Sequence, residues 1–149
     1  MPSTVKDWNH LSDNLRNTES LASFKRQLSN LNKKVPSFFY TGTRQGQILH
    51  ARLRMNGCSL IEHLFLKNIV DSPRCICGEI ESVQHFSLHC HRYSNIRQDM
   101  FESFLNCNIN VAVDLDLLIF GSEELLDEQN AIIFRLFHKF ILKSKRFNN

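Results

Sequence analysis

Three cysteines and one histidine lie close together in the chain, at Cys75, Cys77, His85 and Cys90. Their spacing is C-x-C-x7-H-x4-C, and thiolate sulfur and imidazole nitrogen are the donors that hold zinc in four-coordinate protein sites. Because Cys75 and Cys77 are one residue apart, an extended turn projects both side chains to the same side. The pattern therefore predicts one zinc ion bound by these four side chains.

The segments that carry these residues must bend to bring them together. Gly78 can adopt a positive φ, which lets the chain fold back under the metal ion. His85 and Cys90 belong to a helical pattern, but five residues of regular α-helix span about 500° and point the two side chains roughly 140° apart. We therefore expect the helix to end or loosen just before Cys90. His89 and His91, which flank Cys90, are alternative candidates for the fourth ligand.

Four protein ligands leave no open position on zinc, so the predicted site is structural rather than catalytic and contributes to folding. The alternative interpretation is three buried thiols beside a core histidine, because free cysteine is often buried. The odd total of 5 cysteines and the lack of an apolar segment typical of a secretory signal indicate an intracellular, reducing location, nuclear or cytoplasmic. Cys58 and Cys107 lie in apolar contexts and are expected in the core.

The elements that must position the site follow from the spacing of apolar residues, which predicts a mainly α fold: a small helical domain with one CCHC zinc-binding knuckle. Residues 1–34 are expected to form an amino-terminal helical arm, and residues 35–149 a zinc-stapled helical domain. Residues 37–42 are expected to be extended, and residues 115–120 to form a short helix or a strand. Helical patterns within the domain cover residues 44–55, 60–66 and 83–104.

Turn-forming residues mark where these elements begin and end. Asn56-Gly57 is expected to close the first helix of the domain, with Gly57 as its left-handed cap, and Ser59 to cap the next helix. Gly121-Ser122, followed by two glutamates, is expected to start a long terminal amphipathic helix. The apolar face of that helix is predicted from residues at helical spacing: Ile132, Ile133, Leu136, Phe137, Phe140 and Ile141.

Charge is segregated along the chain, although the net charge is only +3. Residues 21–61 contain no Asp or Glu, and residues 98–134 contain no Lys or Arg. This asymmetry is compatible with a polyanion partner, or with acidic and basic faces that pair within the fold. The candidate nucleic-acid-binding residues are Arg44, Arg52, Arg54, Lys143, Lys145 and Arg146. The last three can instead complement the dipole of a helix end, and Phe38, Phe39 and Tyr40 either stack on unpaired bases or pack in the core.

Several short sequence blocks, spread along the chain, indicate a resemblance to a known family when they are taken together. They are residues 8–11, 23–25, 43–54, 68–73, 75–79 and 84–86, with Cys90 and Tyr93. In this combination the chain resembles, over nearly its whole length, the carboxy-terminal segment of non-LTR (LINE-type) retrotransposon reverse transcriptases. Residues 71–93 are the most specific part, whereas the terminal helix is generic. His91 stands where the family often has proline directly after the last cysteine.

The resemblance implies a zinc module that follows a polymerase and helps it to engage template RNA or target DNA. It implies the same metal ligands as the spacing does: Cys75, Cys77, His85 and Cys90. RNA or DNA is then the expected partner, and no membrane or small-molecule substrate is expected. The alternative is a zinc-stabilised protein-interaction module that meets a protein partner through its terminal helix, or a relic fragment without retained function.

Residues for intrinsic catalysis are not apparent. A polymerase needs paired aspartates to hold two metal ions, but the chain has no Asp-Asp dipeptide and its 149 residues are too few for a polymerase. Acidic residues crowd into residues 98–134 instead of alternating along strands, as a ribonuclease H site would require, and no endonuclease site is recognisable. Cys58 and Cys107 have no base partner at a readable spacing. We therefore expect a protein that is not an enzyme.

Overall fold

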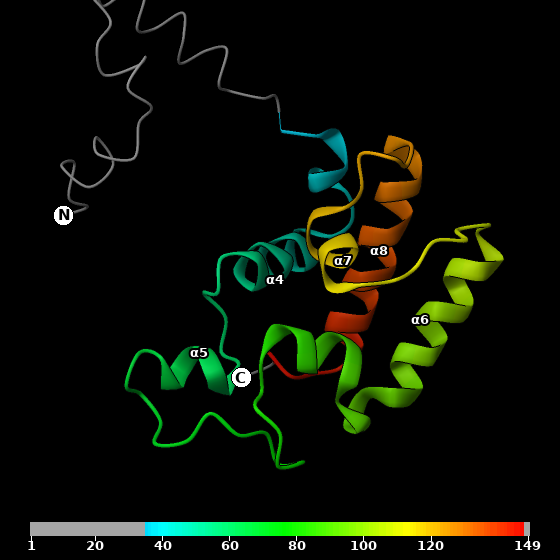
Figure 1. The fold of residues 1–149 in the computed structure, drawn as a ribbon. Coiled ribbons are helices and arrows are strands. Elements are labelled where there is room, and N and C mark those ends of the chain that lie inside the picture. The colour runs from blue at the N-terminus through cyan, green and yellow to red at the C-terminus, as the bar shows by residue number, and fades with distance from the viewer. Residues whose placement is uncertain (1–34, 148–149) are drawn as a thin grey trace, which may run out of the picture. The chain divides into compact units, whose positions relative to one another are not determined.

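Residues 35–147 are the part of the chain that the computed structural model describes, and they fold mainly as helices (Figure 1). In chain order the elements are η1 (Ser37–Tyr40), α4 (Arg44–Arg54), α5 (Ile61–Phe65), the π-helix η2 (His85–His89), η3 (His91–Tyr93), α6 (Ser94–Asn106), α7 (Leu115–Phe120) and α8 (Asp127–Lys143). Apart from one isolated bridge between Arg74 and Ile80, these residues form no β-structure. The predicted mainly α fold is therefore confirmed. The arm expected over residues 1–34 lies outside the described residues, and the boundary at residue 35 stays a prediction.

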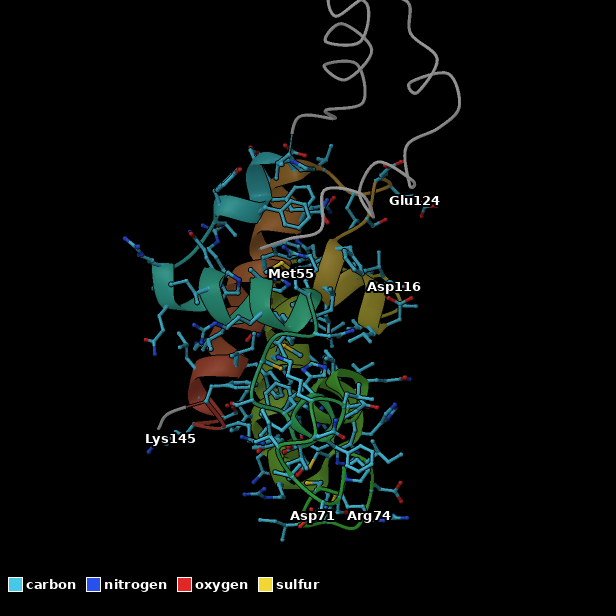
Figure 2. All side chains as sticks on the ribbon, turned by 90° about the vertical axis from the view of Figure 1, so that its left-hand side faces the viewer. Met55, Asp71, Arg74, Asp116, Glu124 and Lys145 are labelled. Atoms are coloured by element: carbon cyan, nitrogen blue, oxygen red, sulfur yellow. The ribbon has the colours of Figure 1, made fainter. Side chains whose placement is uncertain are left out.

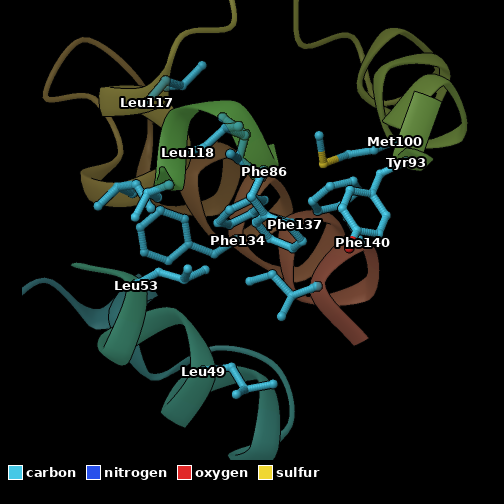
Figure 3. Packing of buried hydrophobic residues seen from close by; sticks show 14 of the residues in the cluster. Leu49, Leu53, Phe86, Tyr93, Met100, Leu117, Leu118, Phe134, Phe137 and Phe140 are labelled. Atoms are coloured by element: carbon cyan, nitrogen blue, oxygen red, sulfur yellow. The ribbon is translucent and has the colours of Figure 1, made fainter. Parts of the chain in front are cut away.

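The long helix α8 is the element on which the others pack, since η1, α4, α6 and α7 all contact it (Figure 1). Its apolar residues recur every three or four positions, and five of them are at most 1% exposed: Ile133, Phe134, Phe137, Phe140 and Ile141. Figure 3 shows Phe134 and Phe137 in the same cluster as Leu53 of α4 and Leu118 of α7. Full burial of each such side chain contributes about 1.5–3 kcal/mol. The prediction of a long terminal amphipathic helix is thus confirmed, and its apolar face is the core of this domain.

The start of α8 differs from the prediction. The helix begins at Asp127 rather than near Gly121. Residues 121–126 instead form a loop that is hydrogen-bonded to a side chain from the first turn of the helix. The side chain of Asn130 accepts a hydrogen bond from the Ser122 N–H (2.9 Å) and donates one to the Ser122 carbonyl (2.8 Å). The polar residues that indicated a helix start therefore belong to the loop.

The aromatic segment before α4 is a 3-10 turn rather than an extended chain. Phe38 is buried and stacks on Phe39, with ring centroids 5.0 Å apart. Both rings lie edge-on to Phe134 of α8. Core packing therefore accounts for these two rings, whereas Tyr40 is 68% exposed.

Side-chain and backbone caps define the shorter helices. Residues 115–120 form a helix, α7, because Asp114 Oδ1 accepts the Leu117 N–H at 2.8 Å. At the end of α4 the left-handed residue is Asn56 (φ 51°) rather than the predicted Gly57. The Gly57 N–H reaches back to the Arg52 carbonyl (2.8 Å), as in a Schellman motif. Asparagine is the non-glycine residue that best tolerates this conformation.

The expected cap of α5 by Ser59 is not formed. Instead the buried Glu81 carboxylate, from the connection that leads to η2, accepts the Ile61 N–H at 2.8 Å. Arg146, beyond the end of α8, donates to both oxygens of this carboxylate and also to the Ser59 carbonyl. This Glu81–Arg146 clasp therefore ties together the start of α5, the connection from α5 to η2 and the segment after α8.

The charge segregation of the sequence persists in the fold. Asp114, Asp116 and Glu124 line one hollow beside α7, and Figure 2 shows Asp116 and Glu124 on one side with Lys145 on the other. Within residues 35–147 two ion pairs form, Arg146–Glu81 and Lys143–Asp99. In the described part of the chain, these two pairs join the basic segment at the end of α8 to acidic side chains that precede it in the sequence.

A buried histidine pair joins α4 to α8. His50 Nδ1 lies 2.9 Å from His138 Nε2, and His50 Nε2 lies 3.1 Å from the Ile119 carbonyl of α7. The helices approach closely here because Gly46 has no side chain, and a Cβ at that position would lie 2.8 Å from His138 Cβ. The hydrogen bonds are consistent if His50 donates to Ile119 and accepts from His138, which requires the His50 ring to be neutral.

This pair makes stability depend on pH. The pKa of His50 falls to about 3 and that of His138 to about 4, first because burial disfavours imidazolium and then because Arg54 is close. Both values lie below the ordinary 6.5, so the unfolded state binds more protons than the folded state once the pH drops below that value. The contribution is fully present above pH 6.5 and is lost as the pH falls. We expect zinc-loaded protein to lose about 2–3 kcal/mol of unfolding free energy from this pair between pH 7.5 and pH 5.5.

Urea unfolding at the two pH values measures this loss, and the zinc content at each pH controls for metal release. His63 and His85 also have lowered pKa values, chiefly through burial, so the pair must be isolated by comparison with His50→Gln. The glutamine can keep both hydrogen bonds but does not titrate. The variant should show a pH dependence smaller by about 1 kcal/mol. An unchanged pH dependence would mean that the pair does not set the acid sensitivity.

Candidate metal centre

The four predicted ligands come together at one point of the fold. The ligand atoms of Cys75, Cys77, His85 and Cys90 all lie within 4.8 Å of one another. Cys75 Sγ is 3.9 Å from Cys90 Sγ, and Cys77 Sγ is 3.1 Å from His85 Nε2. In a regular tetrahedron with zinc–sulfur bonds of about 2.3 Å, two sulfur atoms lie roughly 3.8 Å apart. The group can therefore hold a metal ion with little rearrangement.

A tight turn presents the first two cysteines. The Gly78 N–H donates to the Cys75 carbonyl (2.9 Å), and the Cys75 N–H donates to the Glu79 carbonyl (2.7 Å). Gly78 has φ +96°, a conformation that residues with a Cβ adopt only with strain. As the sequence predicted, glycine at this position allows the chain to fold back beneath Cys75 and Cys77.

A π-helix positions the other two ligands. The Cys90 N–H donates to the His85 carbonyl at 2.7 Å, which is the i to i+5 bond of a π-helix and closes η2. A π-helix has more residues per turn than an α-helix, so His85 and Cys90 diverge less than α-helical geometry would make them. Cys90 itself leaves the helix, with ψ 119°. The expectation that the helix loosens before Cys90 is confirmed, and π-helices of this kind occur frequently at functional sites.

The electrostatics of the cluster suit a bound cation. Burial raises the pKa of the Cys90 thiol to about 11, and Cys75 adds to this effect. At Cys75 burial also disfavours the thiolate, but hydrogen bonds from Cys77 and Cys90 outweigh it and lower the pKa. Burial lowers the pKa of His85, which keeps its imidazole neutral and able to donate a lone pair. Several thiolates cannot share this small buried space without a positive ion between them, and the donor set therefore fits a divalent metal.

The two alternative histidines lie outside the cluster. His89 and His91 are exposed and line an open hollow of about 680 Å³ on the side of Cys77 and His85. Neither belongs to the group of residues in the described structure whose ligand atoms converge. The structure thus favours Cys90, rather than a flanking histidine, as the fourth ligand.

Of the two remaining cysteines, which were both expected in the core, one is buried and the other is exposed. Cys58 is buried, as predicted, and its Sγ lies 2.9 Å from His63 Nδ1, a partner that was not apparent from the sequence. Burial raises the pKa of Cys58 and lowers that of His63, so a neutral thiol donates to a neutral imidazole. Cys107 is exposed rather than buried.

The six cations predicted to bind nucleic acid fall into two groups. Arg54 donates twice to the Ile119 carbonyl and lies 4.2 Å above the Phe39 ring, and Arg146 forms the clasp with Glu81. These two side chains are held by the fold. The other four are exposed: Arg44, Arg52, Lys143 and Lys145. Of these, Lys143 pairs with Asp99 at 3.3 Å.

A hollow of about 390 Å³ between α4, α5 and Phe147 gathers cations from two segments. Arg52 comes from α4 and Lys67 from the turn after α5, and both side chains are exposed. Phe147 and Ser59 also line this basic hollow, and none of its lining residues is acidic. Lys67 carried no signal in the sequence, because the turn that brings it to α4 cannot be recognised from local spacing.

Comparison of the chain with protein-family models, with curated proteins and with solved structures gives no match. No helix within residues 35–147 has the length and apolar character that a membrane span requires. The function is therefore inferred from the geometry of the metal cluster and the distribution of charge around it.

Proposed function

We propose that this chain is a non-catalytic zinc-binding module that binds RNA or DNA, in the manner implied by its resemblance to the carboxy-terminal segment of LINE-type reverse transcriptases. The convergence of three thiol groups and one imidazole within 4.8 Å carries the metal assignment. Tetrahedral sites rich in thiolate select zinc among the common divalent ions, and four protein ligands make the ion structural. In that role the metal fixes the connection between α5 and α6, and with it the surface next to α5.

The basic hollow supports the nucleic-acid part of the proposal. Arg52 and Lys67 present two charges across an open depression that contains no carboxylate, which suits a phosphate backbone. Lys145 is exposed and next to Arg146, whose guanidinium donates to the Ser59 carbonyl at the edge of the same hollow. The charge of Arg146 is already paired with Glu81, so Arg52 and Lys67 are the cations among the residues that line the hollow.

Neutralising the hollow should weaken nucleic-acid binding. The double variant Arg52→Gln, Lys67→Gln removes two phosphate contacts, and the slope of log affinity against log salt should become shallower by about 1–2. Fluorescence anisotropy with single-stranded RNA and with duplex DNA at several salt concentrations measures both the affinity and the slope. Arg135→Gln, on the exposed face of α8, is a matched control that should change the slope little. Wild-type protein that binds neither nucleic acid at low salt would overturn the proposal.

A protein-interaction role is the second candidate, and one observation favours it. Apolar side chains are exposed at the end of α5 and in the zinc-binding turn: Leu66 is 71%, Ile69 62% and Ile76 84% exposed. The terminal helix α8 is a poorer candidate interface, because its apolar face is covered by the other helices. A concentration-dependent molar mass without nucleic-acid binding would support this alternative.

A further inference from the structure

Arg97, in the first half of α6, is buried directly against the metal-binding segment. Its side chain is among the least exposed charged groups of the described residues, with the residue only 7% accessible. Its Nε donates to the Ser87 carbonyl at 2.8 Å, and its Nη2 donates to the carbonyls of Cys90 (2.8 Å) and Phe86 (3.4 Å). One guanidinium thus binds the backbone of the π-helix and of the last metal ligand at the same time.

These contacts fall where regular helical hydrogen bonding stops. Carbonyls in the last turn of a helix lack partners within the helix, and here the turn ends at a buried ligand, since Cys90 is 0% exposed. A planar guanidinium can reach several acceptors in fixed directions, which a lysine ammonium on a flexible chain cannot reproduce. Arg97 therefore holds the backbone in the shape that points His85 and Cys90 toward each other.

The charge of Arg97 has no carboxylate partner among the described residues, where the ion pairs are formed by other cations. A buried cation without a compensating anion is costly. A divalent ion held by three thiolates and one neutral imidazole carries one net negative charge. The loaded cluster would therefore supply the missing counter-charge beside the Cys90 backbone.

We propose that Arg97 is a positioning residue of the metal centre, which holds the ligand-bearing turn by its carbonyls and balances the negative charge of the loaded Cys3His cluster. This inference rests on the proposed zinc site. It adds that metal affinity depends on a charge supplied from α6, a helix that contributes no ligand.

The test measures Co²⁺ and Zn²⁺ affinity by absorption of the Co²⁺ complex and by competition with a chelator. Arg97→Gln keeps a hydrogen-bond donor but removes the charge, and it should weaken metal binding about 10–100-fold. Arg97→Lys keeps the charge, and its metal affinity should fall clearly less than that of Arg97→Gln. Arg135→Gln, an exposed arginine of α8, should leave the affinity unchanged. Helix content measured by circular dichroism at saturating metal shows that each variant has folded.

A second background separates charge from backbone contacts. Cys77→His converts the centre to two thiolates and two imidazoles, a natural zinc donor set without net charge. In that background Arg97→Gln should weaken metal binding clearly less than the expected loss of about 10–100-fold in the wild type, because only the contacts with the backbone carbonyls are then lost. Equal losses in the two backgrounds, or equal losses for Arg97→Gln and Arg97→Lys, would overturn the charge-balancing role. Wild-type protein that binds neither metal would instead refute the zinc site itself, so the two failures are distinguishable.

Discussion

Removal of the metal ion is expected to unfold the domain around residues 75–90. Elemental analysis should find one zinc ion per chain, and a strong chelator should release it together with much of the helical circular-dichroism signal. Apparent binding free energies at structural zinc sites are about 10–16 kcal/mol near neutral pH, whereas a whole domain is stable by only about 5–15 kcal/mol. A zinc ion bound here with such a free energy would therefore contribute as much as the rest of the fold.

The expected loss extends beyond the ligands because the segment that they hold is part of the core. Phe86, which directly follows the ligand His85, is fully buried and packs on Phe140 of α8 with ring centroids 5.3 Å apart. Apart from the turn around Gly78, the single π-turn and the Glu81–Arg146 clasp, few hydrogen bonds fix the connection from α5 to η2. Without the metal, η2 should detach from α8 and expose Phe140.

A pair of cysteine variants makes the test specific. Cys90→Ser removes a buried ligand and should abolish stoichiometric zinc binding and the cooperative thermal transition. Cys107→Ser changes an exposed cysteine outside the cluster and should leave the zinc content and the stability within about 0.5 kcal/mol of the wild type. Wild-type protein that is well folded and free of zinc would contradict the metal assignment and leave the cysteines as core residues.

The cluster of three cysteines and one histidine could be predicted from the sequence because its chemistry is local. Residue types and spacing alone identified Cys75, Cys77, His85 and Cys90. The turn angle of a regular α-helix was sufficient to predict that the helix loosens before Cys90, where the structure has the π-helix η2. The apolar periodicity of α8 was equally readable, since a helix that packs on several neighbours must be apolar along one face.

The contacts that position the site were not readable, because their partners are distant in sequence. Glu81 and Arg146 are 65 residues apart, as are Arg54 and Ile119, and His50 and His138 are 88 apart. Ile119 takes part only through its backbone carbonyl, and in the sequence each of the other five looks like an ordinary polar residue of a helix or turn. Arg54 and Arg146 were therefore read as candidates for phosphate binding, although both are held by groups that only the tertiary fold brings near.

Breaking the Glu81–Arg146 clasp should be the most damaging change outside the metal ligands. Glu81 is 1% exposed, and its carboxylate binds Arg146 Nε (2.8 Å), Arg146 Nη2 and the Ile61 N–H. Burial alone would raise the pKa of Glu81. The contacts with Arg146 and Ile61 outweigh this effect, so the pKa lies below its ordinary value. Arg146→Gln leaves this carboxylate buried without a cation, and we expect a loss of about 3–5 kcal/mol in unfolding free energy by urea denaturation.

The second partner of the clasp provides the decisive comparison. Glu81→Gln combined with Arg146→Gln removes both charges, and the glutamine at position 81 can still accept the Ile61 N–H, so the double variant should be more stable than Arg146→Gln alone. Lys145→Gln, a change at the exposed neighbour, should cost less than about 0.5 kcal/mol. If Arg146→Gln instead kept full stability and lost affinity for RNA or DNA, the side chain would have to leave Glu81 to bind phosphate. The clasp would then be a contact that nucleic acid displaces, and Arg146 would join Arg52 and Lys67 in the basic hollow.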